Sequence, residues 1–211
     1  MSRGLFITLE SADGAGKTTA RGYILDHLKA RGKEVVCTRE PGGTPFGEEM
    51  RSILLHSDQG ILPETELLLF YAARIEHIDK VIKPALEDGK WVISDRFEES
   101  TKAYQGAGAG MSTSIIEKIS EASIKGFVPD ATLVLDITEE TMRERSQARD
   151  TIETVDRFET ESWQFKQRVR EYFENLAQSK ERRIIQIDAN PPIDVVQKNI
   201  ISAIDQIVDS R

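Results

Sequence analysis

A glycine-rich segment that follows a short apolar run constrains this chain more than any other feature. Residues 5–9 are apolar enough for a buried strand, and residues 10–19 read Glu-Ser-Ala-Asp-Gly-Ala-Gly-Lys-Thr-Thr. Glycines let backbone N–H groups converge on a phosphate, and the N-terminus of a following helix adds partial positive charge. The pattern therefore predicts a strand, a phosphate-binding loop (P-loop) and a helix that together bind a nucleoside triphosphate.

Within this loop the side chains have separate roles. Lys17 is expected to bridge the β- and γ-phosphates, and the hydroxyl of Thr18 is expected to bind Mg²⁺. Ser11 stands where the usual pattern has glycine, which a serine tolerates if its φ is negative or its side chain points away from the nucleotide. The residues expected to bind the triphosphate are Ser11, Ala12, Asp13, Gly14, Ala15, Gly16, Lys17, Thr18 and Thr19.

Short apolar runs alternate with helical patterns along the rest of the chain. The strands are predicted at 5–9, 34–37, 91–94, 131–135 and 183–187. Helices are predicted at 18–30, 63–89, 160–177 and 195–208, with a short helix at 47–55. Such alternation predicts an α/β protein with the three-layer α/β/α fold of P-loop NTPases, in which helices flank a five-stranded parallel sheet. Residues 1–211 are expected to form a single domain. The charged stretch at about 143–158 is too polar for a core and is expected to be a mobile lid.

Composition excludes several classes of protein. The net charge of −8 argues against a nucleic-acid polymer as partner, and no apolar run approaches the ~20 residues needed to cross a membrane. The single cysteine, Cys37, rules out an internal disulfide and is expected to be buried, so we expect a cytoplasmic location. His27, His56 and His77 have no partner that the sequence identifies and are expected at the surface or half-buried.

Charged residues after the second and third strands indicate a second anion. In an open parallel sheet, ligands bind outside the carboxyl ends of the strands, so Asp13, Glu40, Asp95 and Arg96 should lie near the γ-phosphate. Bringing two anions together requires cations, and arginine binds phosphate in bidentate fashion. Arg51 and Arg96 are expected to hold an acceptor phosphate. Asp95 is expected to orient Mg²⁺ or its waters.

Five separated segments resemble the signature segments of thymidylate kinases. They are the loop at 10–19, Thr-Arg-Glu-Pro-Gly-Gly-Thr at 38–44, Leu-Leu-Phe-Tyr-Ala-Ala-Arg at 68–74, Asp-Arg-Phe at 95–97, and Ala-Tyr-Gln-Gly at 103–106. Residues 156–159 also resemble the end of the lid in this family. Residues 188–192 resemble its last loop, which lies beside the adenine site. The resemblance implies an enzyme that transfers the γ-phosphate of ATP to dTMP with the help of Mg²⁺, giving dTDP and ADP. It also suggests a homodimer formed through helices such as 63–88.

The resemblance also implies individual roles at the acceptor site. Phe70 would stack on thymine and Arg74 would hydrogen-bond a base carbonyl, while Tyr104 under the sugar would disfavour a 2′-hydroxyl. Asp13 would approach the 3′-hydroxyl, and Gln105 would lie near the base. The implied substrate-binding residues are Asp13, Glu40, Pro41, Arg51, Leu55, Phe70, Arg74, Arg96, Ser100, Tyr104 and Gln105.

The lid arginines distinguish two types within the family. Gly14 follows Asp13, so the loop itself has no arginine, and the chain resembles the bacterial type in which the lid supplies one. Arg149 is the first choice for that role and Arg145 the second. The predicted catalytic residues are Lys17, Arg96, Arg149 and Asp95, and the predicted metal ligands are Thr18 and Asp95.

Three alternatives remain open from the residues alone. One is a kinase for another nucleoside monophosphate or a deoxynucleoside. The second is a P-loop ATPase switch without kinase activity, which would leave Arg51, Arg74 and Arg96 unexplained. The third is a catalytically inactive relative of the kinases, with Ser11 as its defect.

Overall fold

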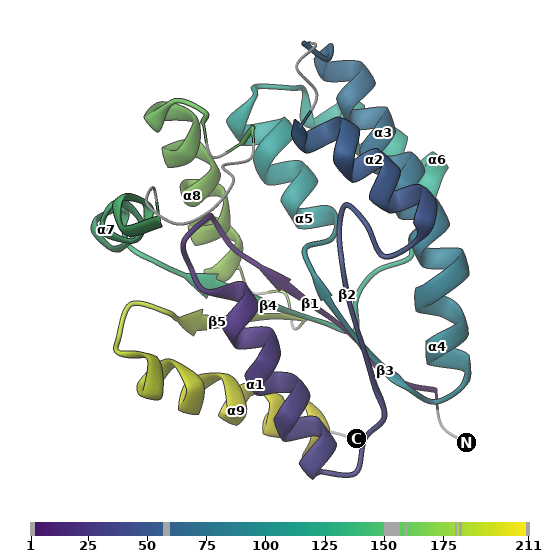
Figure 1. Ribbon diagram of the computed structural model, residues 1–211, viewed down its shortest axis with the longest axis vertical. Helices are drawn as coiled ribbons and strands as arrows, with labels where there is room; N and C mark the ends of the chain where they lie inside the picture. Colours follow the sequence, from purple (N-terminus) through teal and green to yellow (C-terminus); the bar gives the residue numbers. More distant parts are fainter. Residues whose placement is uncertain are drawn as a thin grey trace.

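A five-stranded parallel sheet forms the centre of the computed structural model, which describes residues 3–56, 60–149, 157–158, 160–179, 181 and 183–209 (Figure 1). Its strands are β1 (Phe6–Glu10), β2 (Val35–Arg39), β3 (Trp91–Asp95), β4 (Ala131–Asp136) and β5 (Ile184–Asp188). They lie in the order β2-β3-β1-β4-β5. The central strand β1 is buried along its whole length, because helices cover both faces of the sheet. The predicted fold class is confirmed.

Helices form the two outer layers. On one face α1 (Lys17–Ala30) packs against α9 (Ile193–Asp209) (Figure 1). The helices on the other side of the sheet are α2 (Pro45–His56), α3 (Pro63–His77), η1 (Ile78–Ile82), α4 (Lys83–Glu87), α5 (Glu98–Thr101), η2 (Lys102–Gly108), α6 (Thr113–Ile124) and α8 (Trp163–Ala177). The remaining helix, α7 (Glu139–Arg149), follows β4 and lies beyond the strand ends (Figure 1). None of the helices in the described part of the chain is long and apolar enough to span a membrane.

The strand register brings three strand ends together. Leu9 of β1 and Arg39 of β2 both pair with Asp95 of β3, and the chain leaves all three strands at the same edge of the sheet. The loop after β1, the loop after β2 and the turn after β3 therefore lie side by side. This arrangement places the predicted donor and acceptor residues next to one another.

Two local predictions differ from the structure. The helix predicted over 63–89 is divided, because a π-helical segment, η1, separates α3 from α4. Pro84 at the start of α4 has no N–H and cannot continue the usual hydrogen-bond pattern, which explains a change of pattern at this point. Cys37, expected to be buried, is exposed, because β2 is an edge strand that pairs only with β3.

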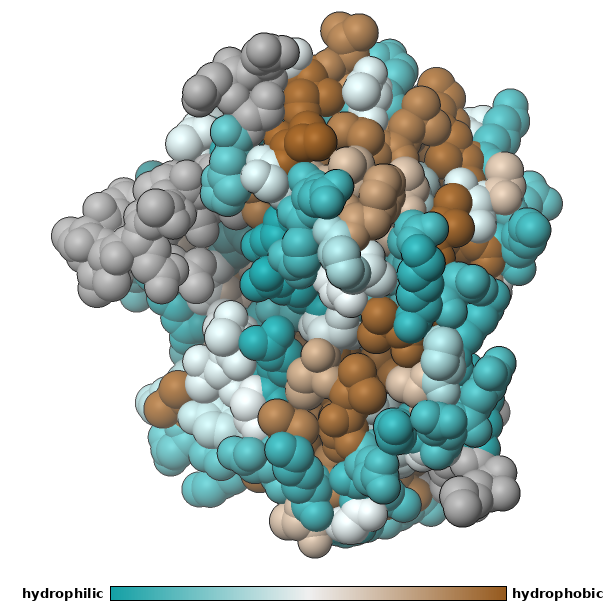
Figure 2. All heavy atoms as spheres, turned by 45° about the vertical axis from the view of Figure 1, so that its right-hand side comes forward, coloured by the Kyte–Doolittle hydropathy of each residue, from teal (hydrophilic) through white to brown (hydrophobic). Residues whose placement is uncertain are grey.

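An apolar patch lies on the outside of the helical layer. Figure 2 shows hydrophobic side chains gathered on the face that carries α2, α3 and α6. The exposed large hydrophobic residues on these three helices are Phe46, Ile53, Leu68, Ile75 and Ile115. We call these five residues the α2–α3–α6 patch. The helices that carry it pack against one another, since α3 contacts both α2 and α6.

Candidate active site

The phosphate-binding loop runs from β1 into α1 as the sequence predicts. Gly14 and Gly16 have φ values of 83° and 86°, a conformation that favours glycine. Among the described residues other than glycine, only Arg96 and Lys125 have positive φ. Ser11 therefore has the negative φ that a serine at this position requires. The Ser11 side chain forms hydrogen bonds within the loop. Its hydroxyl donates to the carbonyl of Ala12 at 2.8 Å and accepts from Lys17 Nζ at 3.0 Å.

The charge on Lys17 is balanced by several neighbours. Its pKa is lowered to about 8, first by burial and then by the nearby cation Arg96, and Asp95, Asp13 and Glu10 oppose the shift. The ammonium group therefore remains mostly protonated at neutral pH, and anionic phosphates would strengthen that state.

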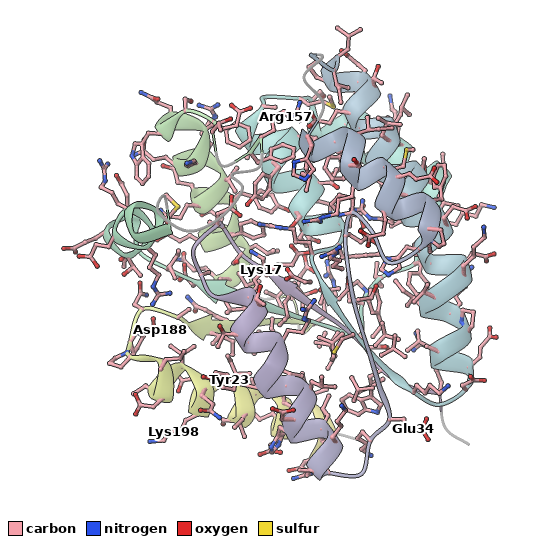
Figure 3. All side chains as sticks on the ribbon, viewed as in Figure 1. Lys17, Tyr23, Glu34, Arg157, Asp188 and Lys198 are labelled. Carbon is pink, nitrogen blue, oxygen red and sulfur yellow. The ribbon has the colours of Figure 1, made fainter. Side chains whose placement is uncertain are left out.

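A polar pocket opens above the loop. Its lining includes Lys17 and Thr18 at the start of α1 and Asp95 at the end of β3. Within the described ranges no group of three or more His, Cys, Asp or Glu could hold a metal ion. One hydroxyl and one carboxylate nevertheless fit Mg²⁺, which usually takes few protein oxygens and completes its shell with phosphates and waters. Figure 3 shows Lys17 beside this loop, with Tyr23 further along α1 and Asp188 at the end of β5.

A second pocket adjoins the first and contains every residue of the predicted acceptor site. Its fourteen lining residues are Asp13, Glu40, Pro41, Arg51, Leu55, Phe70, Arg74, Arg96, Phe97, Ser100, Thr101, Tyr104, Gln105 and Phe158. Eleven of these are the predicted substrate-binding residues. Asp13, Glu40, Arg51 and Arg96 also line the phosphate pocket, so the two pockets share one wall. The individual roles of these residues stay predictions.

Arg96 lies in this shared wall and makes several hydrogen bonds. Nη2 donates to Asp13 Oδ1 at 2.6 Å and to the Tyr104 hydroxyl at 2.8 Å. Nη1 donates to Ser100 Oγ at 3.0 Å and to the carbonyl of Ser11 at 3.1 Å. Burial alone would lower the pKa of Arg96, but Tyr104, Asp13 and other neighbours raise it above its usual value. The guanidinium is therefore charged and held in a fixed orientation.

Arg74 lines the acceptor pocket, with a side chain 2% exposed. Its Nε donates to Glu40 Oε2 at 2.7 Å, and Nη2 donates to the carbonyl of Phe97 and to Thr101 Oγ1. Nη1 is buried and has no hydrogen-bond partner in the structure. Because a buried unpaired donor is unfavourable, this atom is available to a ligand acceptor.

His77 corrects the sequence prediction, which left it at the surface or half-buried. The side chain is fully buried and contacts Glu40 and Thr38, both at least 37 residues away in sequence. His27, which also had no predicted partner, lies 2.8 Å from Asp205 of α9. In both cases the partner comes from a different element, which the order of residues alone does not reveal.

Several site residues were missed by the sequence analysis. Phe158 lines the acceptor pocket, where its ring lies 5.6 Å from that of Tyr104 and 6.3 Å from that of Phe70. Glu66 of α3 accepts a 2.7 Å hydrogen bond from Gln105 Nε2 and also pairs with Arg157. The resemblance of residues 156–159 to a lid segment was the signal that could have located Phe158. Nothing in the sequence pointed to Glu66.

The lid arginines lie in different places. Arg143 pairs with Glu139 and stacks on Trp163, away from both pockets. Arg145 donates to the carbonyls of Gly14 and Ala189. The side chain of Arg149, the first choice for catalysis, lies outside the described residues, as does Asp156.

A third pocket lies on the other side of the loop. It is lined by Gly14, Ala15, Gly16, Thr19, Ala20, Tyr23, Arg145, Ala189, Pro191, Ile193, Val196 and Ile200. Its mostly apolar walls, with one arginine at the edge, suit a flat aromatic base. The pocket includes residues of the last loop, as the sequence analysis expected for the adenine side.

A phosphate-binding loop with a base pocket on one side and an arginine-lined anion pocket on the other defines a P-loop phosphotransferase. A family model described as "Thymidylate kinase" matches residues 9–200. The thymidylate kinase of Nitrosospira multiformis is 49% identical over 203 residues, which cover 96% of this chain and 97% of that protein. The thymidylate kinase of Methylococcus capsulatus is 44% identical, over 99% of this chain and 98% of that protein. The thymidylate kinase of Cupriavidus necator is 52% identical, over 85% of this chain and 88% of that protein. The chain belongs to the thymidylate kinase family.

Proposed function

We propose that this chain transfers the γ-phosphate of ATP to dTMP, giving dTDP and ADP. Membership of the thymidylate kinase family supports both substrates. The observation that carries the proposal at the level of residues is that all eleven predicted acceptor residues line one pocket, which shares a wall with the phosphate pocket. Two nucleotides bound there would meet at their phosphates.

The donor side relies on the loop and the first turn of α1. Backbone N–H groups around Gly14 and Gly16 cradle the phosphates, and Lys17 exchanges its Ser11 hydroxyl partner for phosphate oxygens. Thr18 and Asp95 would hold Mg²⁺, which neutralises charge on the transferred group when it is bound. The adenine occupies the pocket beside Tyr23 and Arg145.

The acceptor side relies on the shared wall. Arg51 and Arg96 hold the dTMP phosphate in line with the γ-phosphate, because both border the two pockets. Phe70 packs against thymine, and Arg74 donates from its unpaired Nη1 to a base carbonyl. The attacking phosphate oxygen is already largely unprotonated, so the reaction needs no general base, and Asp95 acts through the metal and its waters.

A lid at about 143–158 completes the proposal. Its closure excludes water, which would otherwise hydrolyse ATP, and brings an arginine to the γ-phosphate. Arg149 remains our first choice for this cation. Arg145 is already engaged with the loop and the base pocket, which favours a role in binding ATP. Comparing Arg149→Ala with Arg145→Ala separates these roles, since the first should lower kcat and the second should raise KM for ATP.

The α2–α3–α6 patch supports a homodimer. Five exposed hydrophobic side chains on three packed helices form a surface suited to a second copy of the chain (Figure 2). Leu68→Glu should convert the dimer to monomers in sedimentation velocity. Val195→Glu, at an exposed apolar residue of α9 on the opposite face of the sheet, should leave the dimer intact. A wild-type protein that sediments as a monomer would refute this part of the proposal. The proposal also places the enzyme in the cytoplasm, where ATP is available.

A coupled assay of ADP release tests the function. The protein is mixed with ATP, Mg²⁺ and one acceptor at a time: dTMP, dCMP, AMP or thymidine. We expect dTMP to give the highest kcat/KM. Preference for another acceptor would support the alternative kinase, and ADP release that does not depend on dTMP would support an ATPase switch.

A further inference from the structure

His77 is a buried group that the mechanism above does not use. It is the last residue of α3, three positions after Arg74, and η1 begins directly after it. Its ring is 0% exposed and lies outside the acceptor pocket. The Nδ1 atom is 2.9 Å from Glu40 Oε1, and the Nε2 atom is 2.6 Å from Thr38 Oγ1. The ring therefore connects α3 with the end of β2.

The hydrogen-bonding capacities of the partners determine the donors. An ionised carboxylate only accepts, so Nδ1 carries the proton and donates to Glu40. The other ring nitrogen, Nε2, forms its hydrogen bond with the Thr38 hydroxyl. Burial alone would raise the pKa of Glu40, but Arg74 and His77 bring it below its usual value, so the carboxylate is charged. In this arrangement each atom of the ring that can form a hydrogen bond has one partner.

The two oxygens of Glu40 connect His77 to Arg74. Oε1 faces the His77 ring, and Oε2 accepts from Arg74 Nε at 2.7 Å. With Nη2 bound to Phe97 and Thr101, only Nη1 is left for the pocket. If His77 no longer held Oε1, the carboxylate could rotate and form a second hydrogen bond to the guanidinium. That change would turn Nη1 away from the pocket.

We infer that His77 is a positioning residue for recognition of the base: through Glu40 it fixes the Arg74 guanidinium so that Nη1 presents a donor to the acceptor pocket. This inference rests on the proposed function, because it assumes that a pyrimidine base occupies that pocket. Thymine offers a carbonyl at C4, which accepts from Nη1, whereas cytosine offers an amino group, which does not. His77 therefore contributes to discrimination between dTMP and dCMP without touching either.

The chain packs closely around His77, as a positioning role requires. Gly43, with φ +78°, approaches the ring so tightly that a Cβ there would lie 2.6 Å from two ring atoms and from Thr38 Oγ1. The loop that carries Pro41 is thereby held against α3. π-helical turns such as η1 occur frequently at functional sites.

Two matched substitutions test the inference. In His77→Asn the amide nitrogen takes the place of Nδ1 and can still donate to Glu40. In His77→Gln the amide reaches the place of Nε2 and leaves Glu40 Oε1 without its donor. We measure KM for dTMP, KM for ATP and the ratio of kcat/KM for dTMP to that for dCMP, together with dTMP binding by calorimetry in the absence of ATP.

The expected pattern is specific to the pocket. His77→Gln should raise both KM and Kd for dTMP about tenfold and lower the dTMP-to-dCMP ratio by a similar factor, as for loss of a hydrogen bond to a charged group. KM for ATP should stay unchanged, and His77→Asn should remain within about threefold of the wild type in every measurement. Thr38→Val, which removes the partner of Nε2, should shift the dTMP values in the same direction and provides the test if His77→Gln does not fold.

The outcomes separate this inference from the proposed function. A wild-type protein that does not phosphorylate dTMP overturns the proposed function. An active wild type together with a His77→Gln variant of unchanged dTMP affinity and discrimination overturns the inference alone. Equal losses in His77→Asn and His77→Gln that extend to KM for ATP would show that His77 only supports the fold, and would also overturn it.

Discussion

Glu10 provides a prediction whose size follows from the structure. This residue ends β1 and is fully buried; Oε1 accepts from the backbone N–H of Phe97 at 2.7 Å and Oε2 accepts from Ser100 Oγ at 2.6 Å. Burial raises the pKa of the carboxyl from 4.5 to about 7, against the opposing effects of Ser100 and Arg96. The carboxyl is therefore partly protonated near neutral pH.

The raised pKa makes the folded state hold more protons than the unfolded state between pH 4.5 and about 7. The contribution of Glu10 to stability is therefore fully present below pH 4.5 and is lost as the pH rises through 7. Each pKa unit corresponds to about 1.4 kcal/mol, so the total loss is about 3 kcal/mol, most of which falls between pH 5 and pH 8.

The test compares Glu10→Gln with the wild type in urea unfolding at pH 5 and pH 8. Glutamine keeps the acceptor for Phe97 and cannot ionise, so the wild type should lose about 2–3 kcal/mol more than the variant between the two pH values. Other carboxyl groups titrate equally in both proteins and cancel. Glu34→Gln, at an exposed glutamate, serves as the control and should follow the wild type. The reasoning is refuted if the difference between Glu10→Gln and wild type is the same at pH 5 and pH 8.

Three further predictions concern the donor side. The pKa of Lys17 is lowered to about 8, mainly by burial, and bound phosphates would raise it again, so ATP binding at pH 9 should take up most of one proton. Calorimetry in buffers of different ionisation enthalpy measures this proton uptake, and Lys17→Met should abolish the uptake. Arg145→Ala should raise KM for ATP about tenfold and leave KM for dTMP unchanged, whereas equal changes in both would contradict its place in the base pocket. Ser11→Gly should change KM for ATP less than about tenfold, because phosphate oxygens replace the hydroxyl as the partner of Lys17; a larger loss would mean that Ser11 contacts the nucleotide.

Features that depend on local pattern or on strand ends were predictable from the sequence. The phosphate loop is encoded within ten consecutive residues, and the carboxyl ends of parallel strands necessarily meet at one edge, which brought Glu40 and Arg96 to the same wall. The resemblance added Phe70, Arg74 and Gln105, which now line one pocket.

Features that depend on how distant elements pack were not predictable. The burial of His77 requires the end of β2 to lie against the end of α3, and no spacing within either element encodes that contact. Cys37 follows two valines and so resembled a core residue, yet its exposure follows from the place of β2 in the strand order. The bond between Ser11 and Lys17 likewise depends on the three-dimensional path of the loop.

The backbone of Arg96 has a consequence for how this site tolerates change. Its φ of 73° is one that side chains other than glycine avoid at an expense of roughly 1–2 kcal/mol, and the turn is held there by bonds from its N–H to Leu9 and from Ser94 to its carbonyl. Arg96→Gly should therefore relieve backbone strain while removing the guanidinium that four neighbours bind. The four lost hydrogen bonds, at roughly 1 kcal/mol each, exceed the strain that is relieved, so a search for variants that resist heat should retain this arginine in spite of its backbone.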